Sequence, residues 1–196
     1  MRGTPGSRPN VKAPAARRDA PVRAIFLVGF MGAGKTTVGR ALSRELGWRF
    51  EDLDDRIQAR EGRTIPEIFQ RSGEAHFRRS EVSALRELLA EVESSPLIAA
   101  LGGGAFVQEG VASLLAQAGA VTIFLDAPAE ELWRRCARDV IERPLRRMES
   151  EFRQLYEARR PRYLRAQIRV ETDGREIEQI VDAIVSDLGL NSSEEK

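Results

Sequence analysis

The segment Gly29–Thr36 reads GFMGAGKT and matches the pattern G-x-x-x-x-G-K-[S/T] of phosphate-binding loops. Its glycines let the backbone turn tightly, so that successive N–H groups can surround phosphate oxygens. Lys35 is then expected between the β- and γ-phosphates of a nucleoside triphosphate, and the Thr36 hydroxyl is the expected Mg²⁺ ligand. An ordinary glycine-rich turn is the alternative. The apolar run before the loop and the helical pattern after it favour nucleotide binding.

Two acidic residues stand where the second predicted strand ends. Asp52 closes the segment 49–52, and Asp54 follows two positions later. Ligands bind open parallel sheets at the carboxyl ends of their strands, and residues two apart share one side if the strand continues. One carboxylate would hold Mg²⁺ through water while the other accepts a hydrogen bond from an attacking hydroxyl. Alternatively, both acids cap a helix that begins near Leu53, and Asp126, at the end of a later apolar run, is a second candidate metal partner.

Two arginines stand early in a helical pattern that begins after Gly73. Arg78 and Arg79 oppose the helix dipole there, at a local cost of about a few tenths of a kcal/mol. Such a placement indicates another use, such as holding an anionic substrate. The alternative is that both arginines are solvated and pair with Glu74 and Glu81.

Three further segments carry residue types that suit an anionic ligand. Gly102, Gly103 and Gly104 follow an apolar run and would let a ligand approach the backbone closely, although a plain loop is also consistent. Arg143 lies in a charged stretch that could close over a bound nucleotide and bring an arginine to the transferring phosphoryl group. Arg159 opens a basic cluster late in a helix, where helix capping is the commoner use of arginine.

The elements that must position these residues alternate along the chain. Strand patterns separated by helical ones predict a parallel sheet with helices on both faces. The expected strands are 24–29, 49–52, 97–101, 120–126 and 168–172. The expected helices are 35–46, 74–92, 107–118, 128–138, 149–164 and 175–188, with a further short helix from Thr64, where Thr64 and Glu67 form a capping-box pattern.

Composition excludes several classes of protein. Of the 196 residues, 42% are hydrophobic and 31% charged, with no apolar run near the roughly 20 residues of a membrane span. The single cysteine excludes an internal disulfide and a cysteine-rich metal site. The net charge of +1 argues against a protein that coats nucleic acid. We expect residues 1–22 to be a disordered basic tail, with an organelle transit peptide as the weaker alternative, residues 23–189 to be one domain, and 190–196 to fray.

Taken in order, the P-loop, DxD, FRRxE, GGG, RPL and RxPxY motifs resemble those of shikimate kinases, from about Ile25 to Leu188. The resemblance implies an α/β, three-layer P-loop fold, with a five-stranded parallel sheet, helices on both faces and a mobile lid at about 139–149. It implies transfer of the γ-phosphate of ATP to the 3-hydroxyl of shikimate, a step of aromatic amino-acid biosynthesis, with Mg²⁺. The chain departs from the family pattern at Arg162, where leucine is usual.

The resemblance also assigns roles to particular residues. Lys35, Asp54 and Arg143 are the implied catalytic residues, and Asp52 joins Thr36 in holding Mg²⁺, through water. The implied nucleotide-binding residues are Gly32, Ala33, Gly34, Lys35, Thr36, Thr37, Arg135 and Arg143, with the 173–175 turn beside adenine. The implied shikimate-binding residues are Asp54, Arg78, Gly102, Gly103, Gly104 and Arg159.

Other functions remain as alternatives. They are a kinase of another small hydroxylated acid such as gluconate, a non-catalytic nucleotide-binding module, and a nucleic-acid binder that uses the basic tail. We expect a cytoplasmic monomer that acts on a small molecule and uses neither nucleic acid nor a membrane as its partner.

Overall fold

A computed structural model describes residues 21–138 and 149–190 of the chain. The expected tail up to residue 20, the C-terminal end from residue 191, and residues 139–148 of the expected lid, with Arg143, lie outside the described residues. In the described parts, no helix is both long enough and apolar enough to cross a membrane.

Five parallel strands form one sheet in the order β2-β3-β1-β4-β5. The central strands β1 and β4 are buried along their whole length, whereas the edge strand β5 alternates buried and exposed residues. This confirms the predicted α/β fold with a five-stranded parallel sheet. The strands are β1 (Ala24–Val28), β2 (Arg49–Asp52), β3 (Leu97–Ala100), β4 (Val121–Asp126) and β5 (Ile168–Glu171).

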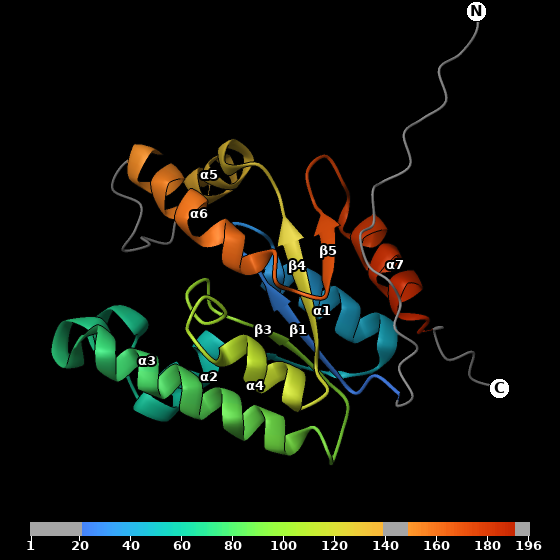
Figure 1. Ribbon diagram of the computed structural model, residues 1–196, viewed down its shortest axis with the longest axis horizontal. Helices are drawn as coiled ribbons and strands as arrows, with labels where there is room; N and C mark the ends of the chain where they lie inside the picture. The colour runs from blue at the N-terminus through green and yellow to red at the C-terminus, as the bar shows by residue number, and fades with distance from the viewer. Residues whose placement is uncertain (1–20, 139–148, 191–196) are drawn as a thin grey trace, which may run out of the picture.

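Helices cover both faces of the sheet (Figure 1). They are α1 (Lys35–Leu46), α2 (Leu53–Glu61), α3 (Ile65–Glu91), α4 (Val111–Gln117), α5 (Ala129–Arg138), α6 (Glu149–Tyr163) and α7 (Ile177–Leu188). Helices α1 and α7 pack together on one side, and α3 and α4 lie on the other. The chain continues from the end of β4 into α5, which with α6 lies beyond the carboxyl ends of the central strands.

Local sequence explains several helix boundaries. Thr64 caps α3, and its side chain and that of Glu67 form the predicted capping box. Gly73 has φ 78° and kinks α3, so the two helices expected on either side of it form one bent element. The helix expected from residue 107 begins later, at Val111, because residues 103–110 form turns after β3.

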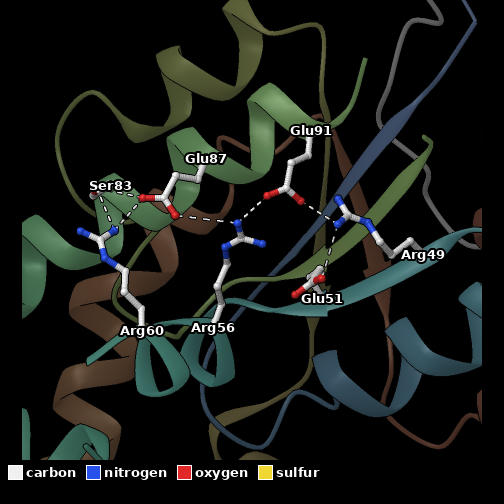
Figure 2. Close-up of polar contacts among 7 residues, drawn as sticks. All are labelled: Arg49, Glu51, Arg56, Arg60, Ser83, Glu87 and Glu91. Atoms are coloured by element: carbon white, nitrogen blue, oxygen red, sulfur yellow. Dashed lines mark hydrogen bonds and ion pairs between the residues drawn. The ribbon is translucent and has the colours of Figure 1, made fainter. Parts of the chain in front are cut away.

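Helices α2 and α3 are joined to β2 by a row of alternating charges (Figure 2). Arg56 of α2 and Arg49 of β2 contact the two carboxylate oxygens of Glu91, at 2.5 and 2.6 Å. Arg60 of α2 contacts Glu87 at 2.8 Å. We call Arg49, Glu51, Arg56, Arg60, Glu87 and Glu91 the α2–α3 charge ladder.

Candidate active site

The phosphate-binding loop joins β1 to α1, as predicted. Gly34 has φ 85°, a left-handed conformation that favours glycine, and it is the N-cap of α1. The Lys35 ammonium donates to the carbonyl oxygens of Gly29 and Phe30, at 3.0 and 3.1 Å. Ala33 is buried and Thr37 is exposed in the first turn of α1. The loop therefore turns the lysine and the positive end of α1 toward one position.

Helices α5 and α6 pack against the phosphate-binding loop. A Cβ at Gly32 would lie 2.8 Å from the carbonyl oxygen of Leu132 and 2.9 Å from Sγ of Cys136, so only glycine fits. The Phe30 ring meets the rings of Phe152 and Tyr156 edge-on, at 4.9 and 5.6 Å between centroids. The elements that flank residues 139–148 are thus packed on the loop itself.

Asp52 contacts the phosphate-binding loop and also caps a helix. Its Oδ2 accepts a hydrogen bond from the Thr36 hydroxyl at 2.7 Å, and its Oδ1 accepts one from the backbone N–H of Asp54 at 3.1 Å. Paired hydroxyl and carboxylate oxygens are ligands that suit Mg²⁺, so Thr36 and Asp52 fit this cation. The other candidate metal partner, Asp126, instead accepts from Arg160 and Arg169, at 2.7 and 2.8 Å.

The position of Asp54 differs in one respect from the expectation of a continuing strand. Strand β2 ends at Asp52, and Asp54 is the second residue of α2. Its carboxylate lies against the triple-glycine loop, because a Cβ at Gly102 would be 2.6 Å from Oδ1 of Asp54. A helix start, and not strand alternation, therefore places the acid at the sheet edge.

The triple-glycine loop, residues 102–104, meets a polar side chain at each of its three positions. Gly102 lies against Asp54 of α2, and a Cβ at Gly104 would lie 2.4 Å from Nη1 of Arg78 of α3. The Gly103 carbonyl accepts from Nη1 of Arg159 of α6 at 3.3 Å. The loop thus gathers one carboxylate and two guanidinium groups from three helices, which a plain connecting loop would not do.

Arg78 is held on two sides by carboxylates. Its Nη1 donates to Glu81 at 2.6 Å, and its Nε and Nη2 donate to Glu74 at 3.2 and 3.0 Å. The pairing with both glutamates that the alternative proposed is therefore present, but Arg78 is half-buried, with its side chain 24% exposed. Its neighbour Arg79 is exposed. Three of the five guanidinium donors are engaged, which leaves one N–H on each Nη for an anion.

Glu81 is a site residue that sequence reasoning did not single out. It is 1% exposed, and its burial raises its pKa to about 7, while Arg78 opposes this shift and Asp54 adds to it. The FRRxE spacing contained a signal, since an acid three residues after Arg78 shares its helix face. The burial of that face was not visible in the sequence.

The C-terminal end of α6 completes the contacts around the triple-glycine loop. The Tyr163 hydroxyl donates to the same Gly103 carbonyl that Arg159 contacts, and burial raises the pKa of Tyr163 to about 12. Arg159 therefore contacts the triple-glycine loop, in contrast to the alternative that it caps its own helix. Arg162, which departs from the family pattern, is exposed.

Residues expected near adenine lie at the far end of the site. Arg135 donates from Nη2 to the Thr172 carbonyl at 2.9 Å, so α5 contacts the chain just before the 173–175 turn. Asp173 and Arg175 line a cavity of about 530 Å³ at the carboxyl ends of β4 and β5. Arg135 and the turn are thus brought together, on the side of the phosphate-binding loop away from Arg78.

A phosphate-binding loop at the carboxyl end of the central strand of a five-stranded parallel sheet, beside a carboxylate and two arginines, defines a P-loop kinase of a small anionic molecule. A model of the shikimate kinase family matches residues 31–189. A shikimate kinase of Thermus thermophilus is 43% identical over 179 residues, which cover 88% of this chain and 95% of that protein. The chain therefore belongs to the shikimate kinase family.

Solved structures agree with this assignment. Shikimate kinase from Acinetobacter baumannii in complex with shikimate has a TM-score of 0.78 at 36% identity, over 88% of this chain and 96% of that one. A gluconokinase from Sinorhizobium meliloti has a TM-score of 0.55 at 17% identity, over 87% and 94% of the two chains, and shares the fold alone.

Proposed function

We propose that the chain transfers the γ-phosphate of ATP to the 3-hydroxyl of shikimate, giving shikimate 3-phosphate and ADP, in the cytoplasm and as a monomer. The observation that supports the acceptor most directly is the triple-glycine loop, which holds Asp54, Arg78 and Arg159 around one position. An acceptor with several hydroxyls and one carboxylate matches one anionic and two cationic side chains.

On the acceptor side, Arg78 and Arg159 bind the carboxylate, because planar guanidinium groups pair with it through two N–H donors. Asp54 orients the acceptor hydroxyl and accepts its proton as the new P–O bond forms. Gly102 and Gly104 leave room for the side chains of Asp54 and Arg78 beside the loop backbone. The acceptor is held in line with the phosphate-binding loop, and such positioning supplies much of the rate in phosphoryl transfer.

On the nucleotide side, backbone N–H groups from Gly32 to Thr36 surround the phosphates, and Thr37 follows in the same turn. Lys35 exchanges its two carbonyl partners for phosphate oxygens and stabilises the charge that develops on the transferred group. Thr36 and, through water, Asp52 would hold Mg²⁺, which neutralises phosphate charge when bound. Arg135 contacts the adenine side, and Arg143, outside the described residues, is the proposed lid arginine.

The proposal is tested by ADP release with shikimate, quinate, gluconate and nucleoside monophosphates as separate acceptors. We expect stimulation by shikimate above all others, and loss of at least about 100-fold in kcat for Lys35→Ala and for Asp54→Asn. No stimulation by shikimate would refute the proposed acceptor. Near-normal kcat in Asp54→Asn would remove Asp54 from the catalytic role.

A further inference from the structure

The side chain of Gln108 contacts Glu81, which pairs with Arg78 beside the triple-glycine loop. The proposed function assigns no role to Gln108. It lies in the turns after the triple-glycine loop, where its backbone N–H donates to the carbonyl of Ala105 at 3.2 Å. Its side-chain Nε2 donates to Oε2 of Glu81 at 2.7 Å. The same oxygen accepts from Nη1 of Arg78 at 2.6 Å. One carboxylate oxygen thus joins the loop to the arginine.

Glu81 needs this second donor because it is buried. An ionised carboxylate that leaves water is costly unless hydrogen bonds and opposite charges replace its hydration. The charged groups that face it are Arg78 on its own helix, Arg159 on α6 and Asp54 on α2, and Asp54 disfavours its charge. Gln108 is the neutral donor of the set. It stabilises the ionised form without adding a positive charge that would compete with Arg78 for the acceptor.

Gln108 also fixes a distance across the pocket. Arg78 lies so close to Gly104 that a Cβ there would overlap its guanidinium. Among the described residues, the loop and α3 also meet through the Gln108–Glu81–Arg78 chain of hydrogen bonds. Loss of the amide would free both the carboxylate and the guanidinium to move away from the loop.

We propose that Gln108 is a positioning residue for the acceptor, whose amide fixes the carboxylate of Glu81 and, through it, the guanidinium of Arg78 against the triple-glycine loop. The inference rests on the proposed function, because Arg78 must bind an acceptor carboxylate. The hydrogen bonds of Gln108 reach Ala105 and Glu81, whereas those of the nucleotide-binding side chains Lys35 and Thr36 reach Gly29, Phe30 and Asp52. Gln108 therefore acts on acceptor binding and leaves ATP binding unchanged.

The test compares Gln108→Met, which keeps the length of the side chain and removes the donor, with Gln117→Met on the exposed face of α4. At pH 8 we expect Gln108→Met to raise the shikimate KM on the order of tenfold, with kcat and the ATP KM within about twofold of wild type. The Gln117→Met control should match wild type. Below pH 6, where Glu81 is protonated in both proteins, the KM difference should narrow.

A second variant tests the hydrogen bond independently of packing. In Gln108→Glu the introduced carboxyl repels Glu81 when both are ionised, and it donates a hydrogen bond when it is protonated. Its shikimate KM should therefore be raised at pH 8 and return toward the wild-type value as the pH falls. A merely structural role would give no such return.

The outcomes separate the two claims. Normal turnover by the wild type, with a shikimate KM unchanged in Gln108→Met between pH 6 and 8, would overturn the inference alone. An equal rise in the ATP KM and the shikimate KM would also overturn it, since Gln108 would then support the fold and not the acceptor. A wild type without shikimate turnover would overturn both the proposed function and this inference.

Discussion

At the scale of single residues, the proposed acceptor site depends on glycines at positions where a Cβ would overlap a neighbouring side chain. Gly104 and Gly39 both lack room for a Cβ, but for different neighbours. A Cβ at Gly104 would lie 2.4 Å from Nη1 of Arg78. A Cβ at Gly39 of α1 would lie 2.3 Å from the ring of Phe50. The first neighbour is the flexible end of a side chain that we propose to bind the acceptor, whereas the second is a ring packed against the hydrophobic core.

We therefore expect Gly104→Ala to change function and Gly39→Ala to change stability. Gly104→Ala should raise the shikimate KM by about tenfold or more, because Arg78 must move, with a melting temperature close to wild type. Gly39→Ala should lower the free energy of unfolding by about 1–3 kcal/mol through overpacking, although alanine normally favours a helix. Steady-state kinetics and thermal unfolding of both variants give the check. A reversed pattern would contradict the distinction.

Glu81 should make the stability of the protein depend on pH. Its pKa of about 7 lies above the ordinary value of 4.5, so its folded state favours the protonated form. The raised pKa contributes to the free energy of unfolding below pH 4.5. This contribution, about 3 kcal/mol in total, is lost as the pH rises through 7. Glu81→Gln cannot ionise and should lack this loss. Urea unfolding of both proteins from pH 4.5 to 8 measures it, and a pH-independent difference would argue against a raised pKa.

At the scale of elements, the charge ladder of Figure 2 sets how α2 lies against α3. Helix α2 carries Asp54 and α3 carries Arg78, so the packing of the two helices affects the separation of two side chains that we propose to bind the acceptor. Between them, Arg56 contacts Glu91 at 2.5 Å and Glu87 at 3.8 Å. Its side chain is 22% exposed, less than its glutamate partners. Arg56 is therefore the central member of the ladder.

Arg56→Met should destabilise the protein in a way that depends on salt. Exposed ion pairs contribute about 0–1 kcal/mol each, so we expect a loss of about 1 kcal/mol at low ionic strength, falling as NaCl is added. Arg86→Met is the matched control: it removes the same charge from α3, where Arg86 is exposed and makes no hydrogen bond or ion pair with the described residues. Chemical unfolding at two salt concentrations distinguishes them. Equal losses in both variants would show that the ladder contributes nothing specific.

The sequence predicts elements better than it predicts which of their faces are buried. The bounds of α1 and the capping box at Thr64 follow from local rules, and all five strands lie within the expected ranges, although β2, with the sequence RFED, has only one apolar residue in four. Residues 107–110 were expected as the start of a helix but form turns, because the apolar spacing there does not reveal that Gln108 turns back to Glu81. An Arg–Glu pair three residues apart looks the same on a solvated helix as on a buried one, so the burial of Glu81 could be recognised only from tertiary contacts.

At the scale of the whole molecule, charge is unevenly distributed along the chain. Residues 1–23 hold six basic residues and one acid, so the remainder has 25 basic and 29 acidic residues. The arginines of the acceptor pocket therefore lie in a mildly acidic domain, where their positive charge is local. The net charge of +1 for the whole chain averages these two parts and indicates neither.

The edges of the domain can be placed by packing. Val22 contacts the hydrophobic core, and the carbonyl of Arg23 accepts from the backbone N–H of Leu97 at 2.9 Å. At the other end, Leu190 also contacts the core, and its N–H closes α7 by donating to Val185 at 3.0 Å. The predicted domain 23–189 should therefore be extended to include Val22 and Leu190.

Removal of residues 1–20 should leave the enzyme intact, because Val22 and Arg23 are retained. We expect kcat, both KM values and the melting temperature, within about 2 °C, to match the full chain. Removal of residues 1–23 exposes part of the core, takes away the carbonyl partner of Leu97, and should lower the melting temperature clearly more.

Titration of the full chain and of the protein without residues 1–20 with duplex DNA, at two salt concentrations, tests whether the basic tail binds nucleic acid. Tight, salt-dependent binding that is lost with residues 1–20 would show that the tail serves nucleic acid, whereas weak binding by both proteins fits a kinase of small molecules.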